Sequence, residues 1–263
     1  MIDDWNTGRV HRFRTEAASR GCPAEEVEEW LKTIRPAVFW TFEGDGPVAA
    51  RLGGDALLPE GEPNPTAPLA ATVDCSLLPS YTGLPLPADG HLLFFAEPYV
   101  GFDGTKDGVV RYLPAGTRPT TRRADSGYDA YPPHDLRMAW LGSSTQDSET
   151  YCQPMWDDDD LEAEEFDHAT DRAEEMKDAW TSVGGLWPMW TFALGGNTIV
   201  LNYDPILSVR EEEPEDAEDW VLLATWRCDE EVKELDMGVI SWLIRRKDLA
   251  SLRFDRVHVC VDM

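Results

Sequence analysis

Apolar residues recur at the spacing of an amphipathic helix near the start of the chain. In residues 24–35, AEEVEEWLKTIR, the apolar positions i, i+3, i+4 and i+7 are Val27, Trp30, Leu31 and Ile34. Pro23 stands where a proline can open a helix, and Pro36 stands where one ends it. The pattern predicts a helix here, and we expect an earlier helix over about residues 8–20.

A second helical pattern is strongly acidic on one face. Over residues 161–180 the apolar positions recur every three or four residues, at Phe166, Ala169, Ala173, Met176 and Trp180. Acidic residues fill the remaining positions. The spacing predicts a helix that buries Met176, as the first helix buries Trp30, and that exposes its carboxylates.

Between and after these helices the pattern is typical of strands. From Gly44 to about residue 118, Gly and Pro separate short apolar runs such as LAATVDC (69–75) and HLLFF (91–95). This spacing predicts antiparallel strands joined by turns. Residues 118–160 are polar, and RPTTRRADSGYDAYPP (118–133) is expected to be a loop.

Four short segments occur twice in the same order. Leu-Gly-Gly at 52–54 matches 194–196, LAATVDC at 69–75 matches LLATWRC at 222–228, Gly90 with its apolar run matches Gly238, and VRY at 110–112 matches VHV at 257–259. The offsets are 142, 153, 148 and 147 residues, so the differences fall in loops. We expect a duplicated β unit.

These patterns predict a β-rich α+β fold in one compact domain, residues 1–263. N-terminal helices cover 1–36, the first β repeat 37–118, a loop and the central acidic helix 119–182, and the second β repeat 183–263.

The same segments resemble the YwqG-like family of uncharacterised bacterial proteins. The resemblance rests on ARLGGDALLPEG, LAATVDCSLLP, LPLPADGHLLFF, VGGLWPMW (183–190) and the C-terminal strands, and covers roughly 37–115 and 183–260. It implies an α+β fold with internal duplication and no agreed activity. Asp55-Ala56 replaces a proline-bearing step of the family, and two glutamines are absent, so ligand contacts by those amides are not carried over.

Charge excludes several classes of partner. The net charge of −27 comes from 50 acidic and 23 basic residues, and it opposes binding to nucleic acid or anionic lipid.

The sequence contains no run of 18 apolar residues, so no membrane span is predicted, and residues 1–14 do not resemble a signal peptide. Five scattered cysteines without a CxxC pair favour the reducing cytoplasm.

Motifs for phosphate loops, zinc proteases and hydrolase elbows are absent, so no catalytic residue is assigned. The five histidines show no metal-ligand spacing. The acidic run Asp157, Asp158, Asp159 and Asp160 admits three interpretations: oxygen ligands for Ca²⁺ or Mg²⁺, a negatively charged helix start, or a surface for a basic partner. No EF-hand loop surrounds it, and we expect neither a structural metal nor a cofactor. Residues 210–219 add seven acids in an expected loop.

Three further side chains are candidates for binding. Trp187 and Trp190 lie in GLWPMW, where Gly and Pro predict a turn from which rings can protrude, although core packing is the usual place for tryptophan. Arg51 precedes Gly53-Gly54 and is a candidate anion contact together with nearby backbone N–H groups.

Two classes of function remain open. The first is a non-enzymatic cytoplasmic binding protein, such as an immunity-like neutraliser of a basic protein, with carboxylates that steer the partner. The second is an enzyme or small-ligand binder that uses a cleft between the two β repeats. Missing catalytic motifs favour the first, and the oligomeric state is open.

Overall fold

The computed structural model describes residues 7–98, 110–146, 148, 150–152, 163–184, 190–228, 232 and 237–263. The chain forms two compact units, where the sequence led us to expect one. The first unit holds residues 1–35 and 143–189, and the second holds 36–142 and 190–263. Each is described by itself.

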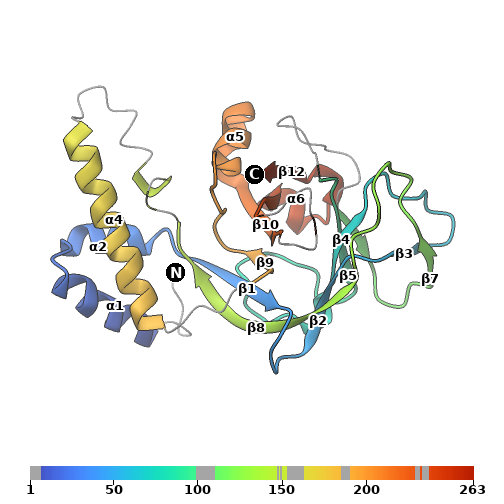
Figure 1. Cartoon of the computed structure of the whole chain (residues 1–263), viewed down its shortest axis with the longest axis horizontal. Coiled ribbons are helices and arrows are strands. Elements are labelled where there is room, and N and C mark those ends of the chain that lie inside the picture. The colour runs from blue at the N-terminus through green and yellow to red at the C-terminus, as the bar shows by residue number, and fades with distance from the viewer. Residues whose placement is uncertain are drawn as a thin grey trace. The chain divides into compact units, whose positions relative to one another are not determined.

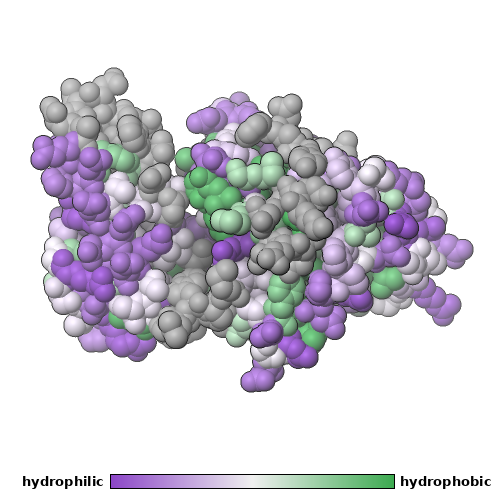
Figure 2. Space-filling model, viewed as in Figure 1, coloured by the Kyte–Doolittle hydropathy of each residue, from purple (hydrophilic) through white to green (hydrophobic). Residues whose placement is uncertain are grey.

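The first unit is built from helices α1 (Thr7–Ser19), α2 (Ala24–Leu31) and α4 (Ala163–Gly184). Trp30 is 1% exposed, and its ring centroid lies 5.0 Å from that of Phe13 and 5.9 Å from that of Trp180. Met176 is buried and the described acids of α4 are exposed, so the helical prediction is confirmed. Hydrophilic side chains gather over α4 in Figure 2.

The C-terminal end of α4 is held by an arginine from α1. The Arg9 guanidinium donates a hydrogen bond to the Trp180 carbonyl at 2.9 Å and lies 4.1 Å over the Trp180 ring. Burial is the main reason that the pKa of Arg9 falls to about 10. The contact joins α1 to the C-terminal part of α4.

The second unit contains a curled ten-stranded sheet with antiparallel strand pairs (Figure 1). The strand order is β12-β11-β10-β9-β1-β8-β2-β4-β5-β6. The bounds are β1 Arg35–Thr41, β2 Val48–Leu52, β4 Leu69–Asp74, β5 His91–Phe95, β6 Val110–Leu113, β8 His134–Ser144, β9 Phe192–Gly195, β10 Trp220–Arg227, β11 Val239–Arg245 and β12 His258–Asp262. A separate two-stranded sheet pairs β3 (Ala56–Pro59) with β7 (Pro119–Arg122).

From the centre of the large sheet toward each edge, the strands follow one another in the order of the sequence. β1 and β8 are neighbours in the middle; β2, β4, β5 and β6 follow on one side, and β9, β10, β11 and β12 follow on the other. Both series therefore run consecutively outward from a central strand pair. We call strands β2, β4, β5 and β6, together with the neighbouring β8, the first half, and strands β9, β10, β11 and β12, together with the neighbouring β1, the second half.

The two halves also share strand register. Leu52 of β2 lies opposite Ala71 of β4, and Leu194 of β9 lies opposite Ala224 of β10. The pairing of β4 with β5 has a register shift just before Ala71, and the pairing of β10 with β11 has one just before Ala224. Both glycines of each Leu-Gly-Gly step have positive φ, between 58° and 91°. Since an L side chain rarely adopts such a φ, glycine is required at these strand ends.

The fourth sequence match does not follow this register. Val110 lies opposite Phe94, whereas the residue opposite the corresponding Trp242 is Val259 and not Val257. The sequence comparison paired similar residues and was displaced by two positions, because short strands carry no other marker of their register.

One face of the large sheet carries most of the hydrophobic core of this unit, including its large aromatic side chains. Trp40, Trp226 and Trp242 are fully buried there, together with Phe94 and Phe192. The Trp242 ring centroid lies 5.3 Å from that of Phe94, and its indole N–H donates to the Phe95 carbonyl at 3.2 Å. The core interpretation of the tryptophans therefore holds for these three.

Two segments expected to be loops contain regular structure. Residues 118–133 include β7, and residues 210–219 include the end of α5 (Pro205–Glu212) and a 3₁₀ turn, Pro214–Asp219. Asp204 caps α5 by accepting a hydrogen bond from the Ile206 N–H at 2.9 Å, and Pro205 occupies its first turn. The acidic residues of 210–219 led us to predict a loop, so the helix start at Asp204 and Pro205 was not recognised in the sequence. A short helix, α6 (Arg246–Ala250), follows β11.

No helix in the described ranges is long and apolar enough to cross a membrane. All five cysteines are buried and lie outside disulfides.

A candidate ligand pocket

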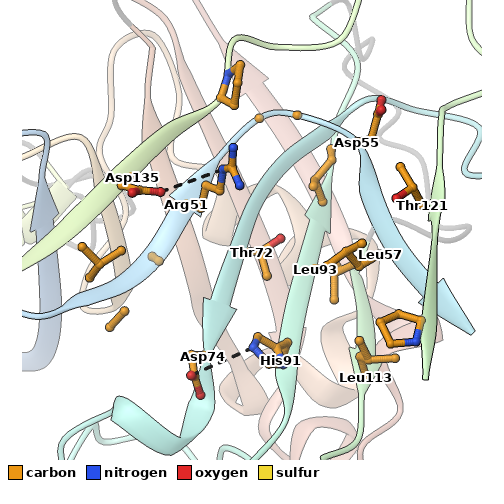
Figure 3. Close-up of a pocket in the computed structure, with 18 of the residues that line it drawn as sticks. Arg51, Asp55, Leu57, Thr72, Asp74, His91, Leu93, Leu113, Thr121 and Asp135 are labelled. Atoms are coloured by element: carbon orange, nitrogen blue, oxygen red, sulfur yellow. Dashed lines mark ion pairs between the residues drawn. The ribbon is translucent and has the colours of Figure 1, made fainter. Parts of the chain in front are cut away.

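A pocket of about 800 Å³ lies on the face of the first half that points away from the aromatic core. Strands β2, β4 and β5 form its floor, and β3 and β7 form one side (Figure 3). The two sheets are held together by a small apolar cluster that includes Leu58, Leu93 and Leu113. This cluster fixes the distance between the floor and that side. The volume is in the range of pockets that enclose small ligands.

Strand register explains which side chains face the pocket. Arg51 lies opposite both Asp135 and Thr72, and Thr72 lies opposite Leu93, so these four form one row across the strands. Because alternate residues of a strand share a face, a second row contains Asp74 and His91, which lie opposite each other. The rows place the pair Arg51–Asp135 at one end of the pocket and the pair His91–Asp74 at the other, with Thr72 and Leu93 between them (Figure 3).

Both pairs are loose and open to solvent. Arg51 Nε lies 3.9 Å from Asp135 Oδ1, and these side chains are 58% and 68% exposed. His91 Nε2 lies 4.0 Å from Asp74 Oδ2. Such exposed pairs are worth only about 0–1 kcal/mol, so an incoming charged group can compete for them.

Asp74 has a structural role as well as a place in the pocket. Its Oδ1 accepts hydrogen bonds from the Ser76 N–H at 2.9 Å and the Ser76 hydroxyl at 2.6 Å, which caps the 3₁₀ turn Cys75–Leu77. Its Oδ2 faces His91. The cap fixes the carboxylate at the end of β4 and leaves one oxygen for the pocket.

The lining of the pocket combines acidic and apolar side chains. Its charged residues are Arg51, Asp55, Asp74 and Asp135, with His91 as the titratable neighbour. Three carboxylates and one guanidinium give a net charge of −2 when His91 is neutral. The apolar lining comes from Leu57, Leu69, Leu93 and Leu113. A positively charged group on an apolar stem matches both features.

Gly53 closes one end of the pocket, because its backbone lies against the chain at Tyr131 and Pro132. A Cβ at Gly53 would lie 2.4 Å from the carbonyl oxygens of both residues, and its φ is +58°. The Gly53 N–H donates to the Ala70 carbonyl and the Gly54 N–H donates to the Tyr131 carbonyl, each at 2.9 Å. These two amides are therefore engaged and are not available for the candidate anion contact beside Arg51.

The sequence-derived candidates are placed as follows. Arg51 lines the pocket. Trp190 is partly exposed, with its ring 5.4 Å from that of Phe39 and 5.4 Å from the Arg227 guanidinium carbon. Asp157–Asp160 and Trp187 lie outside the described residues.

Sequence reasoning missed most of the pocket. In the sequence, His91 stands at the start of the predicted strand HLLFF and was given no role, and Asp55, Thr72, Asp74 and Asp135 were not singled out. The available signal was in LAATVD, where Thr72 and Asp74 alternate with buried Ala71 and Val73 on one strand. Alternation shows that Thr72 and Asp74 share a face, but it does not show that β3 and β7 stand over that face.

The described residues contain no group of three His, Cys, Asp or Glu side chains that could hold a metal ion. Cys75, next to Asp74, is buried, and desolvation is the main cause that raises its pKa to about 12. The thiol is therefore protonated near neutral pH. The polar groups that remain in the pocket are suited to hydrogen bonding and charge pairing.

Comparison with known proteins gives a family without an assigned activity. A family model described as a domain of unknown function, DUF1963, matches residues 50–262, which include the segment between the two halves. No curated protein matches the chain.

Proposed function

This chain belongs to the DUF1963 family, and we propose that it is a non-enzymatic cytoplasmic binding protein for a basic protein. In this proposal the pocket on the first half receives a positively charged side chain of the partner. The observation that carries the proposal is the lining of that pocket, which combines a net charge of −2 with four leucine side chains, Leu57, Leu69, Leu93 and Leu113. A lysine or arginine side chain has the complementary form, a hydrocarbon stem that ends in a cation.

A comparison of the two halves supports a binding role for the charged residues. We propose that the halves are copies of one β unit, because they share strand order and register. By that register Arg51 corresponds to Ala193, and Asp135 corresponds to Phe39. The second half folds with apolar residues at these positions, so the sheet itself does not require the charges.

The same holds for the second row of the pocket. His91 corresponds to Val239, and Asp74 corresponds to Arg227, which has the opposite charge. The acidic lining is thus specific to the first half. The counterparts Ala193, Phe39 and Val239 are buried, so this face of the sheet is covered in the second half and open to a ligand in the first half, which favours a binding site there.

The acidic helix gives a second contribution to the same function. Its described carboxylates are exposed, and the run Asp157–Asp160 precedes it in the sequence. Long-range attraction from such a surface raises the association rate of a basic partner, whereas each exposed pair adds only about 0–1 kcal/mol to affinity. In this proposal the helix attracts the partner, the pocket holds it, and Trp187 or Trp190 adds an apolar anchor.

Binding of a dye-labelled tetralysine peptide, followed by fluorescence anisotropy, tests the proposal. The peptide should bind at about 50 mM salt and be released at about 500 mM, because screening lengths shorten severalfold over that range. Tetraglutamate serves as the control peptide and should not bind. Tetralysine binding that is unchanged between the two salt concentrations would contradict the electrostatic mechanism.

A matched pair of substitutions locates the binding. Asp74→Asn keeps an oxygen for the Ser76 cap and removes the charge, and should weaken tetralysine binding by about fivefold, which corresponds to about 1 kcal/mol. Asp171→Asn removes the same charge from the exposed surface of α4 and should change the affinity much less. Equal effects of the two substitutions would show that the peptide binds to acidic surface in general.

A small-ligand binder is the second candidate, and the pocket volume of about 800 Å³ favours it. The described pocket is lined by residues 48–135, so it does not lie between the two halves, where the sequence analysis placed a cleft. Under this alternative a free alkylamine such as cadaverine would saturate the pocket as tightly as tetralysine does.

A further inference from the structure

Proteins bind organic cations in two chemically different ways. An aromatic cage presents ring faces to the cation and accepts a quaternary ammonium that has no N–H groups. A site of carboxylates and hydroxyls instead accepts hydrogen bonds, so it needs N–H donors on the cation. The lining of the pocket decides between these two modes.

The pocket offers no aromatic cage. Apart from the imidazole of His91, Tyr131 is the one aromatic residue among the described lining residues. Tyr131 is 6% exposed, its hydroxyl donates to the Ala96 carbonyl at 2.9 Å, and its ring lies edge-on to Trp226 with centroids 4.9 Å apart. Its ring therefore packs into the core and does not surround the pocket.

Hydrogen-bond acceptors are present on three sides instead. Asp74 lies at one end and Asp135 at the other, while Asp55 lies on the side formed by β3 and β7 (Figure 3). Thr72 on the floor and Thr121 on β7 add hydroxyl oxygens. One head group cannot reach both ends, but a group with N–H bonds can donate to the carboxylate at either end and to a neighbouring hydroxyl, whereas a trimethylated nitrogen has no N–H to donate.

We propose that the pocket selects an unmethylated ammonium or guanidinium group, and that trimethylation of the lysine it receives releases the partner. This inference rests on the proposed function and adds a specificity to it. Trimethylation keeps the positive charge, so long-range attraction by the acidic surface is unchanged. It removes all N–H donors and enlarges the head group, so the loss of binding has to arise inside the pocket.

Two peptides of equal charge test this proposal with the full-length protein. The first is dye-labelled tetralysine, and the second is the same peptide with trimethyl-lysine at each position. The dissociation constant of the trimethylated peptide should be at least tenfold higher at about 50 mM salt, where exposed charges are weakly screened. Tetra-arginine should bind comparably to tetralysine, because a guanidinium retains its N–H donors.

The other possible results of these titrations separate the proposed selectivity from the proposed function. Equal binding of the methylated and unmethylated peptides would overturn the selectivity and leave the proposed function standing. Failure of every cationic peptide to bind would overturn both proposals. The Asp74→Asn variant should lose part of the discrimination, whereas Asp171→Asn on α4 should retain it in full. Retention of the full discrimination in Asp74→Asn and its loss in Asp171→Asn would place the selective site on the helix and contradict the proposal.

Discussion

Replacement of Arg51 by alanine distinguishes a cation pocket from an anion site. Arg51 is the one guanidinium among the described lining residues, and it lies 3.9 Å from Asp135. If the pocket receives a cation, Arg51 competes with the ligand for Asp135, and its removal changes the charge of the lining from −2 to −3. The Arg51→Ala variant should therefore bind tetralysine more tightly than the unmodified protein.

The size of the effect follows from the exposure of the pair. Arg51 and Asp135 are 58% and 68% exposed, so their interaction is worth at most about 1 kcal/mol. Release of Asp135 should tighten binding by up to about fivefold, since about 1.4 kcal/mol corresponds to tenfold. The free energy of unfolding should fall by no more than the same amount.

Fluorescence anisotropy measures the affinity, and urea denaturation measures stability. Arg253→Ala is the matched control, because Arg253 is 50% exposed and pairs with Asp255 outside the pocket. It should change tetralysine binding much less than Arg51→Ala does. A several-fold loss of tetralysine affinity in Arg51→Ala, or tetraglutamate binding that depends on Arg51, would refute this reasoning.

Three other outcomes are expected. Trp30→Ala should destabilise the helical unit by about 3–5 kcal/mol in a urea titration, because it removes a large side chain that is 1% exposed; a loss below about 1 kcal/mol would contradict its place in the core. At pH 8 the native protein should react with a thiol reagent far more slowly than the unfolded protein does. Burial raises the pKa of Cys75 and of Cys260 to about 12 and leaves almost no thiolate. Rapid labelling of either residue in the native protein would oppose this. Replacement of Asp157–Asp160 by Asn should slow association with a basic partner and flatten its salt dependence in stopped-flow measurements, with little change in the unfolding midpoint; an unchanged association rate would assign these residues no part in steering.

Much of the local structure could be predicted from the sequence, because helices and strands leave periodic apolar patterns. The stripe that contains Trp30 and the stripe that contains Met176 both become buried helix faces. The Leu-Gly-Gly steps were recognisable because only glycine readily adopts the positive φ found there. Each of these signals lies within a few consecutive residues.

The pocket could not be predicted, because its residues come together only through strand pairing. Arg51 and Asp135 are 84 positions apart in the sequence and lie opposite each other across β2 and β8. The side formed by β3 and β7 was hidden as well, since β7 lies in a polar segment that was interpreted as a loop. Non-local pairing leaves no periodic signal in a single sequence.

The most direct test of a cation pocket on the first half is an NMR titration of isotope-labelled protein with tetralysine. The account predicts progressive shifts of the backbone amide signals of Thr72, Asp74 and His91, which line the pocket, and little change at Thr225 and Val239 in the second half. Asp74→Asn should reduce those shifts at the same peptide concentration. Shifts confined to α4, or equal shifts in the two halves, would contradict the account.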